Sequence, residues 1–338
     1  IAGVGSVLVF LPQILILFFF ILLLEDVGYL PRAAFLLDRI MGSVGLSGRA
    51  FLPLLSSFAC AIPGIMAART IQNPRDRLVT IMIAPLMTCS ARLPVYALLI
   101  AAFIPDREVA GLMNLQGLVL FALYMAGILS AMGVAWFMKR RSDYKQHALM
   151  MELPAYHWPQ PGALASGLWE RARIFLKRVG TLILTMMILL WVLSSFPGAP
   201  EGATHPPIYY SVAGMIGRAL EFILAPIGFG WEIGIALVPG MAAREVAVGA
   251  LAQVYALSGG DEAANALAPL VAQSWSLATG LALLTWYIYA PHCLPTLATV
   301  ARETGSRRYA WNMAGYMFGL AYVAAFIVYR TTLFFTGA

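Results

Sequence analysis

Charged residues are scarce in this sequence. Asp, Glu, Lys and Arg make up 11% of the 338 residues, whereas a soluble globular domain carries about 25%. So little charge excludes an ordinary water-soluble domain. Hydrophobic residues make up 61% of the chain, and the mean hydropathy is +0.80. These values are typical of an integral membrane protein, whose outside as well as its inside faces apolar groups.

Cysteine is rare as well. The three cysteines, Cys60, Cys89 and Cys293, all lie in apolar surroundings. They are too few for a disulfide framework, and they say little about the compartment.

Motifs of catalysis and of nucleotide binding are also missing. No G-x-x-x-x-G-K-[ST] phosphate loop occurs, so the chain does not bind GTP by that route. No H-E-x-x-H motif or plausible Ser-His-Asp set is present, since His147, His157 and His205 fall in polar connections. We therefore expect this chain not to be an enzyme. The chain has a net charge of +6. In a membrane protein, basic residues indicate which side of the membrane a loop occupies and need not bind nucleic acid, so we expect no nucleic-acid partner.

Long apolar stretches are what the sequence has in abundance. A helix crosses the hydrocarbon layer with about 20 apolar residues, and none of the stretches alternates like a barrel strand. The sequence therefore predicts an all-α, multi-pass membrane protein. The candidate spans are Val4 to Leu24, Leu78 to Ile104, Leu115 to Met138, Val179 to Phe196, Pro269 to Ala290 and Ala310 to Phe335.

The basic residues predict an orientation for these spans. The stretch from Lys139 to Arg178 is rich in Lys and Arg, which assigns it to the cytoplasm. The connections Pro197 to Pro207 and Pro105 to Met113 are then external. The same map places further arginines on the cytoplasmic side: Arg69, Arg75, Arg77, Arg302, Arg307 and Arg308.

Two short segments interrupted by Pro and Gly occur in matching contexts. Phe51 to Ala68 contains Pro63-Gly64, and Gly228 to Ala243 contains Pro239-Gly240. Both are short for a span, so we interpret them as re-entrant or unwound, with full crossing as the alternative. A second break follows each, at Pro85 and at Pro291. The pattern predicts two repeats of opposite orientation, an arrangement common in transporters.

These repeats suggest a division of the chain. The first gate repeat is expected over residues 1–104 and the second over 179–302. A connecting span and cytoplasmic linker would occupy 105–178, and a C-terminal span 303–338.

Each break frees backbone carbonyls that must find new partners. In hydrocarbon an unpaired backbone group costs several kcal/mol, so matched breaks indicate a place where protein, water or an ion satisfies them. A kink in a packed helix is the simpler interpretation of any single proline. Four breaks in matched positions favour a site.

All three cysteines lie within these broken segments. Cys60 is three residues before Pro63, Cys89 four after Pro85, and Cys293 two after Pro291. Sulfur beside freed carbonyls suits a soft or borderline transition metal rather than Na⁺, Mg²⁺ or Ca²⁺. One such cysteine alone would more often be a small buried hydrophobe. The additional candidate ligands are Met66, Met87 and His292, although the two methionines are more typical of core packing than of metal binding.

Two ionisable groups inside apolar segments need partners. Arg92 lies within the span Leu78 to Ile104, and Glu245 adjoins the second short segment. Groups of this kind are usually paired or line a pathway. Glu245 is therefore a candidate partner of Arg92 or a ligand for a passing cation, and a purely structural ion pair is an equal alternative.

Several strings in the chain resemble a known family. They include Pro63-Gly64-Ile65-Met66-Ala67-Ala68-Arg69, Ala84-Pro85-Leu86-Met87-Thr88-Cys89-Ser90-Ala91-Arg92 and Ala242-Ala243-Arg244-Glu245-Val246. With Met151-Glu152-Leu153-Pro154 and Arg302-Glu303-Thr304-Gly305-Ser306, they are similar to the membrane domain of the bacterial ferrous iron transporter family FeoB. The likeness extends over nearly the whole chain.

This resemblance implies Fe²⁺ as the transported substrate and the bacterial inner membrane as the location. It implies pathway cysteines at Cys60 and Cys89. In the second gate the family tends to place a Cys directly after the Pro, whereas here His292 intervenes, so either Cys293 or His292 takes that role.

The resemblance also implies an amino-terminal G domain that binds GTP and Mg²⁺. Because the chain starts at Ile1 and lacks the phosphate loop, we expect it to be a fragment of a longer protein. Besides the bilayer and that G domain, the candidate partners are small cytoplasmic Feo accessory proteins and a second copy of the chain.

Two other functions fit a gate architecture. A carrier of nucleosides or another small solute would place Asn, Gln and Glu around the breaks, where this chain has Cys, Met and Pro. A non-transporting membrane scaffold would not need the cysteines at all.

Overall fold

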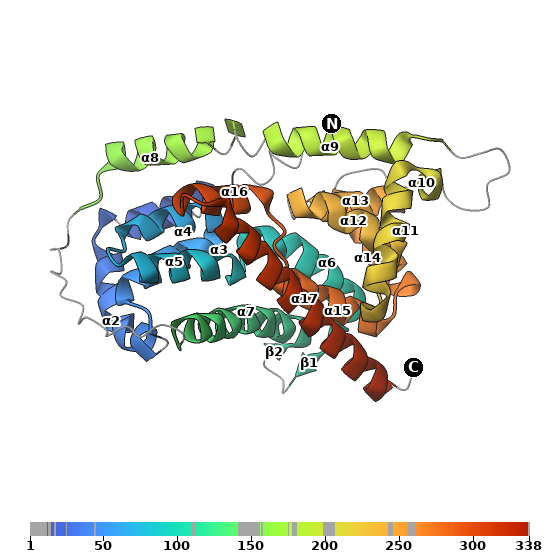
Figure 1. Ribbon diagram of the computed structural model, residues 1–338, viewed down its shortest axis with the longest axis horizontal. Coiled ribbons are helices and arrows are strands. Elements are labelled where there is room, and N and C mark those ends of the chain that lie inside the picture. The colour runs from blue at the N-terminus through green and yellow to red at the C-terminus, as the bar shows by residue number, and fades with distance from the viewer. Residues whose placement is uncertain are drawn as a thin grey trace.

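A computed structural model of the protein shows a bundle of helices (Figure 1). Helices α8 (Pro161–Ile174) and α9 (Thr181–Ser195) lie along one side of the bundle, and α7 (Leu115–Arg140) lies along the opposite side. The structure describes residues 12, 15–16, 18–24, 26–43, 45–109, 113–140, 156, 158–174, 176–177, 181–198, 207–242, 246–255 and 261–336.

The first repeat is a series of short helices separated by breaks. Helix α5 shows how such a helix begins: Asn73 caps it by accepting a hydrogen bond from the Arg75 amide at 3.0 Å, and Pro74 occupies its first turn. The elements are α2 (Tyr29–Ser43), η1 (Gly48–Ala50), α3 (Phe51–Ala59), α4 (Ala61–Ala67), η2 (Ala68–Thr70), α5 (Pro74–Ile83), η3 (Ala84–Leu86), η4 (Ser90–Arg92) and α6 (Leu93–Phe103).

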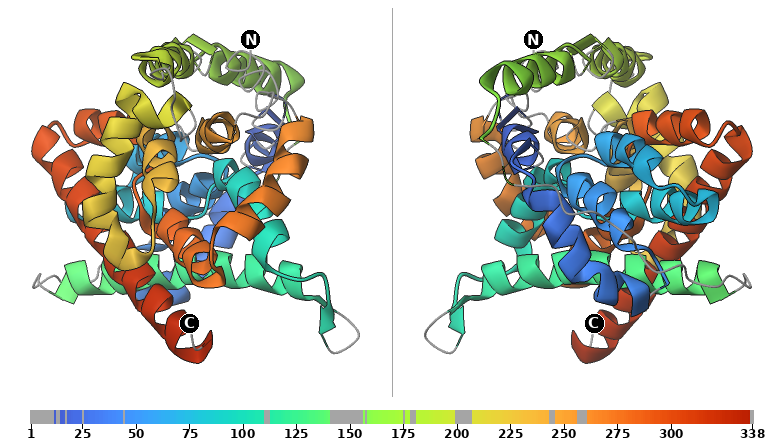
Figure 2. Two further views of the ribbon diagram at one scale, coloured as in Figure 1. Left: turned by 90° about the vertical axis from the view of Figure 1, so that its right-hand side faces the viewer. Right: turned by 90° about the vertical axis from the view of Figure 1, so that its left-hand side faces the viewer.

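A hairpin and α7 follow the first repeat. Strands β1 (Glu108–Val109) and β2 (Met113–Asn114) pair antiparallel and project from the bundle (Figure 2). They are the only strands among the described residues. The prediction of an all-α protein with broken helices is therefore confirmed.

The second repeat and the last helix complete the bundle. Helix α17 crosses the molecule diagonally (Figure 1). The elements are α10 (Pro207–Tyr210), α11 (Val212–Leu224), η6 (Ala225–Ile227), α12 (Trp231–Ala242), α13 (Val246–Val254), α14 (Asp261–Ser274), α15 (Leu277–Tyr289), α16 (Leu294–Glu303) and α17 (Arg307–Thr336).

Three predicted spans match helical segments long and apolar enough to cross a membrane. These segments are Pro74–Phe103, Leu115–Arg140 and Arg307–Thr336 within the described ranges. The first of them is interrupted at η3 and η4, as the proline at position 85 predicts. Most of the predicted span Val4 to Leu24 lies outside the described residues. Helix α9 covers 15 residues of the predicted span Val179 to Phe196, which stays a prediction.

The predicted span from Pro269 to Ala290 is bent and is not one straight helix. The chain bends by 117° between the segments Leu267–Ser274 and Leu277–Glu303. The cause is a new helix start: the hydroxyl of Ser276 accepts a hydrogen bond from the Thr279 amide at 3.1 Å, which caps α15 and ends the run. A second bend, of 105°, separates the segment Val212–Ile227 from Trp231–Met241.

The two largest buried clusters among the described residues hold the bundle together. One joins α6, α12, α15 and α17 around side chains such as Leu99, Ile233 and Leu283. The other joins α3, α4, α5, α7 and α17 around Ile65 and Ile83. Helix α17 contributes to both clusters, so it connects the two repeats.

Candidate functional site

Cys60 lies at the break in the first short segment. It separates α3 from α4 and has extended backbone angles, φ −155° and ψ 134°. The two helices fold tightly against each other, because a Cβ atom on Gly64 would lie 2.0 Å from the Ser57 hydroxyl. The segment is interrupted as predicted, but the break falls at Cys60 and not at Pro63-Gly64, which lie inside α4. In the second repeat Pro239-Gly240 likewise lie inside α12, so the break predicted there is not found in that helix.

Cys89 lies in the next break and close to the first. It precedes η4 with extended angles, φ −84° and ψ 161°. The hydroxyl of its neighbour Ser90 donates to the carbonyl oxygen of Ala59 at 3.1 Å. That bond joins the residue after Cys89 to the residue before Cys60, so the tertiary structure brings these two breaks together.

Cys293 begins helix α16 after the irregular residues Pro291 and His292. Its backbone is extended, with φ −164° and ψ 93°. Helix α16 packs against α4, the helix that Cys60 begins. All three cysteines are therefore half-buried and start a helical segment in extended conformation.

The cysteines do not form a ready metal cage. Within the described ranges, no three His, Cys, Asp or Glu side chains come together in a group that could hold a metal ion. The assignment of Cys60, Cys89 and Cys293 as ligands stays a prediction.

His292 is buried and held by an aromatic neighbour. The indole Nε1 of Trp286 donates a hydrogen bond to His292 Nε2 at 3.0 Å. The ring also stands edge-on to Tyr287, with 4.6 Å between the ring centroids. Because Nε2 accepts this hydrogen bond, the neutral ring carries its proton on Nδ1. A metal ion would therefore have to displace the Trp286 N–H to bind Nε2.

The other predicted ligands have different surroundings. Met87 is 5% exposed and belongs to the buried cluster of the first repeat, whereas Met66 is 41% exposed. Glu245 lies outside the described residues, so its pairing with Arg92 stays a prediction.

Arg92 is fully buried and lies over the break at Pro85. Its guanidinium donates to the carbonyl oxygen of Pro85 at 3.0 Å, and more distantly to the carbonyl of Leu86 and the hydroxyl of Thr88 at 3.5 and 3.4 Å. A side-chain cation thus satisfies carbonyls that the broken helix frees.

Aromatic side chains complete the surroundings of the breaks, and sequence reasoning missed them. The Tyr316 hydroxyl donates to the carbonyl oxygen of Met82, near the end of α5. Tyr124 stacks on Phe58, with 6.4 Å between the ring centroids. The residue type could have indicated these contacts, since a buried Tyr needs a hydrogen-bond partner for its hydroxyl.

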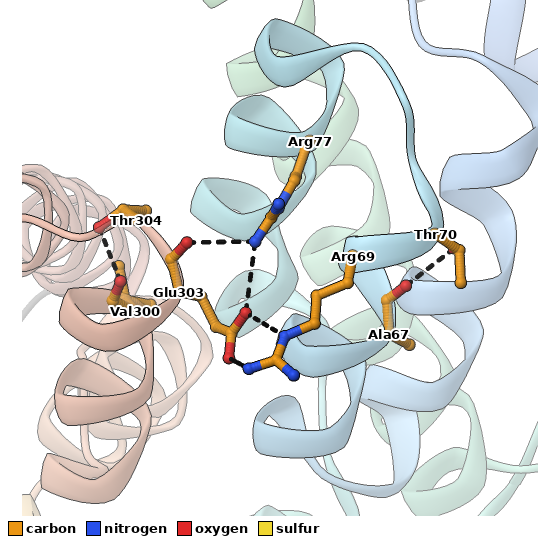
Figure 3. A network of polar contacts seen from close by, with 7 residues as sticks. All are labelled: Ala67, Arg69, Thr70, Arg77, Val300, Glu303 and Thr304. Atoms are coloured by element: carbon orange, nitrogen blue, oxygen red, sulfur yellow. Dashed lines mark hydrogen bonds and ion pairs between the residues drawn. The ribbon is translucent and has the colours of Figure 1, made fainter.

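An ion-pair network joins the first repeat to the end of α16, and sequence reasoning missed it too (Figure 3). The Glu303 carboxylate accepts from Arg69 Nε at 2.7 Å and Nη2 at 2.5 Å, and lies 3.4 Å from Arg77 Nη2. Arg77 also donates to the backbone carbonyl of Glu303 at 3.2 Å. The hydrogen bonds that Arg69 donates to Glu303, and then the negative charge of that carboxylate, raise the pKa of Arg69.

The fold and these breaks define a class of protein: a helical membrane protein with paired broken helices. Comparison with known proteins defines the family. The family model described as "Nucleoside recognition" (Gate) matches residues 7–103 and 176–307, and "Ferrous iron transport protein B C terminus" matches 120–171. The chain belongs to the FeoB family.

Relatives from several bacteria cover almost the whole chain. It is 41% identical to the Fe(2+) transporter FeoB of Leptospira interrogans serovar copenhageni, over 99% of this chain and 50% of that protein. The corresponding values for the Fe(2+) transporter FeoB of Staphylococcus aureus strain COL are 40%, 98% and 48%. A fusion protein of Porphyromonas gingivalis, named Fe(2+) transport protein A/Fe(2+) transporter FeoB, is 37% identical over 99% of this chain and 44% of its own length.

The chain thus spans about half the length of the curated relatives it matches. No solved structure matches it.

Proposed function

We propose that this chain forms the membrane pathway of a transporter that moves Fe²⁺ across the bacterial inner membrane. The family membership and the names of the relatives support Fe²⁺ as the substrate. The observation that carries the proposal is the position of the cysteines: each one lies at a helix break, and the Ser90 to Ala59 hydrogen bond holds two of these breaks together.

The proposed ligands are Cys60, Cys89 and Cys293, assisted by backbone carbonyls. A borderline cation such as Fe²⁺ accepts sulfur ligands that Mg²⁺ and Ca²⁺ disfavour. Transport needs binding that is strong enough to replace water and weak enough to allow release. Half-buried thiols at separate breaks suit such a passage, with water and carbonyl oxygens as the remaining ligands.

In the second repeat we propose Cys293 rather than His292 as the ligand. Cys293 starts α16 in extended conformation, next to the break. His292 Nε2 already accepts the Trp286 hydrogen bond. Met66 and Met87 assist at most, since Met87 is packed in the core.

The driving force is proposed to come from outside this chain. A G domain that binds GTP and Mg²⁺ would bias the relative position of the two inverted repeats, and small Feo proteins would assist it. The fused relative of Porphyromonas gingivalis supports such an accessory partner by its name.

The test is metal flux into proteoliposomes that contain the full-length protein, with the G domain and GTP. We expect wild type to accumulate ⁵⁵Fe²⁺. In the triple variant Cys60→Ser, Cys89→Ser, Cys293→Ser, the uptake rate should be at least about tenfold lower. The control is Met215→Leu, which removes an exposed sulfur that is not a candidate ligand. Equal uptake by wild type and the triple variant would refute the cysteine pathway.

The same proteoliposome experiment also tests the alternative function, transport of nucleosides. The family model that matches both repeats is described as nucleoside recognition. Uptake of labelled uridine or adenosine without Fe²⁺ flux would favour that function. No flux of either kind by the folded protein would favour a scaffold.

A further inference from the structure

The carboxylate of Glu303 is almost buried and faces two arginines of the first repeat. Its side chain is 5% exposed, whereas those of Arg69 and Arg77 are 62% and 33% exposed. Glu303 is the last residue of α16, and Arg69 follows α4 within η2. The contact therefore links the ends of two helices that are more than 200 residues apart in the sequence.

The geometry of this contact is specific. Arg69 donates with both Nε and Nη2, one to each carboxylate oxygen, at 2.7 and 2.5 Å. A two-point contact of this type fixes the direction of both side chains, which a single hydrogen bond does not. Arg77 adds a hydrogen bond to the backbone carbonyl of Glu303, so the end of the helix itself is held (Figure 3).

The two helices joined by this contact both begin at a cysteine. Cys60 starts α4 and Cys293 starts α16. Since α16 packs against α4 and the contact joins their carboxyl-terminal ends, the helices run in the same direction. Nine residues separate Cys60 from Arg69, and ten separate Cys293 from Glu303. At about 1.5 Å per helical residue, the two cysteines come to nearly the same level.

We propose that Glu303 is a positioning residue for metal passage: with Arg69 and Arg77 it sets the register of the Cys293 helix against the Cys60 helix. The proposal rests on the proposed function. If α16 slides by one turn, Cys293 moves about 5.4 Å along the axis away from the level of Cys60. The ion pairs oppose that movement while they are intact.

The location of the network favours a positioning role over a ligand role. The positive-inside pattern places Arg69, Arg77 and the end of α16 on the cytoplasmic side. Two guanidinium groups surround the carboxylate, so an approaching cation meets two positive charges first. Glu303 therefore acts on the pathway through the placement of α16.

The first measurement is a distance. Spin labels are attached to Cys60 and Cys293 of the full-length protein that carries Cys89→Ser, and the distance distribution is measured by pulsed electron paramagnetic resonance. We expect one narrow distribution with Glu303 present and a broader or shifted one in Glu303→Gln. The control is Arg302→Gln, an exposed charge in the same turn of α16, which should leave the distribution unchanged.

The second measurement is ⁵⁵Fe²⁺ uptake by unlabelled variants in a double-mutant cycle. We expect Glu303→Gln to slow uptake about fivefold or more, and Arg69→Gln to add little to Glu303→Gln, because coupled residues are not additive. An unchanged distance distribution in Glu303→Gln overturns the proposal, whatever the uptake. Fully additive losses also overturn it. If wild type shows no uptake, the transport function fails, while the distance result still tests the register.

Discussion

The guanidinium of Arg92 donates a hydrogen bond to the carbonyl oxygen of Pro85, with 3.0 Å between Nη2 and the oxygen. Arg92 follows Pro85 by seven positions, and the helix between them is broken. Arg92 is fully buried within a segment long enough to cross the membrane. A charge in such a place is rare, and here it supplies donors for backbone groups that the break leaves without helical partners.

Arg92 is therefore expected to be needed for the fold of the first repeat. Arg92→Met removes the charge and leaves the Pro85 and Leu86 carbonyls without their donor, at a cost of about 1–3 kcal/mol for each buried group. We expect a lower midpoint of thermal unfolding in detergent and slower Fe²⁺ uptake.

Arg92→Lys is the matched comparison, because it keeps the charge and loses the planar fork. It should fall between wild type and Arg92→Met in unfolding midpoint. If Arg92→Met unfolds at the wild-type temperature, the guanidinium does not support the break.

The two sulfur-containing residue types should respond differently to substitution. Cys60→Ser and Cys89→Ser each remove a thiol beside a break, and we expect each to slow ⁵⁵Fe²⁺ uptake about tenfold. Met87→Leu keeps the volume of a core side chain, so uptake should stay within about twofold of wild type. A larger effect of Met87→Leu than of the cysteine variants would show that the thioether, and not the thiols, carries the metal.

Substitution at position 292 separates the two candidate ligands of the second repeat. His292→Gln keeps an acceptor for the Trp286 N–H and removes the imidazole, so we expect uptake within about twofold of wild type. Cys293→Ser should slow uptake about tenfold. The opposite order of effects would make His292 the ligand. His292→Leu should lower the unfolding midpoint, because it leaves the buried Trp286 N–H without its acceptor.

Gly127 of α7 is expected to tolerate no side chain. A Cβ atom at this position would lie 2.9 Å from the Thr88 hydroxyl and 3.1 Å from the Leu86 carbonyl oxygen, directly beside the second break. Gly127→Val should therefore displace that break, lower the unfolding midpoint and slow uptake.

Gly133 in the same helix is the matched control. A Cβ atom there meets nothing within 4 Å, so Gly133→Val should have little effect on either measurement. Equal behaviour of the two valine variants would contradict the close packing of α7 against the break.

Much of the fold could be predicted because its causes are local. The apolar run from Leu115 to Met138 is long enough to cross the membrane regardless of its neighbours. Pro85 interrupts a helix because its ring removes a backbone N–H and clashes with the preceding turn. The bend within the predicted span Pro269 to Ala290 was not predicted, because hydropathy does not register a bend. The Ser276 cap that starts α15 is a weaker signal than the apolar residues on both sides of it.

The site was predictable in part for the same reason. The types of Cys60, Cys89 and Cys293 and their spacing from prolines are visible in the sequence, and the structure places all three at helix starts. The partners of Arg92 were not predicted, since the natural expectation for a buried cation is a carboxylate. Carbonyl oxygens become available to it only once the helix has broken and folded back.

By itself the sequence determined that this protein lies in a membrane, is built of helices and breaks them beside its cysteines, since apolar length and proline act within a few residues. Only the tertiary structure decided which breaks meet, through Ser90 and Ala59, and which charges pair, through Glu303 and Arg69. Those contacts join residues from about 30 to more than 200 positions apart, and such proximity arises only when helices pack.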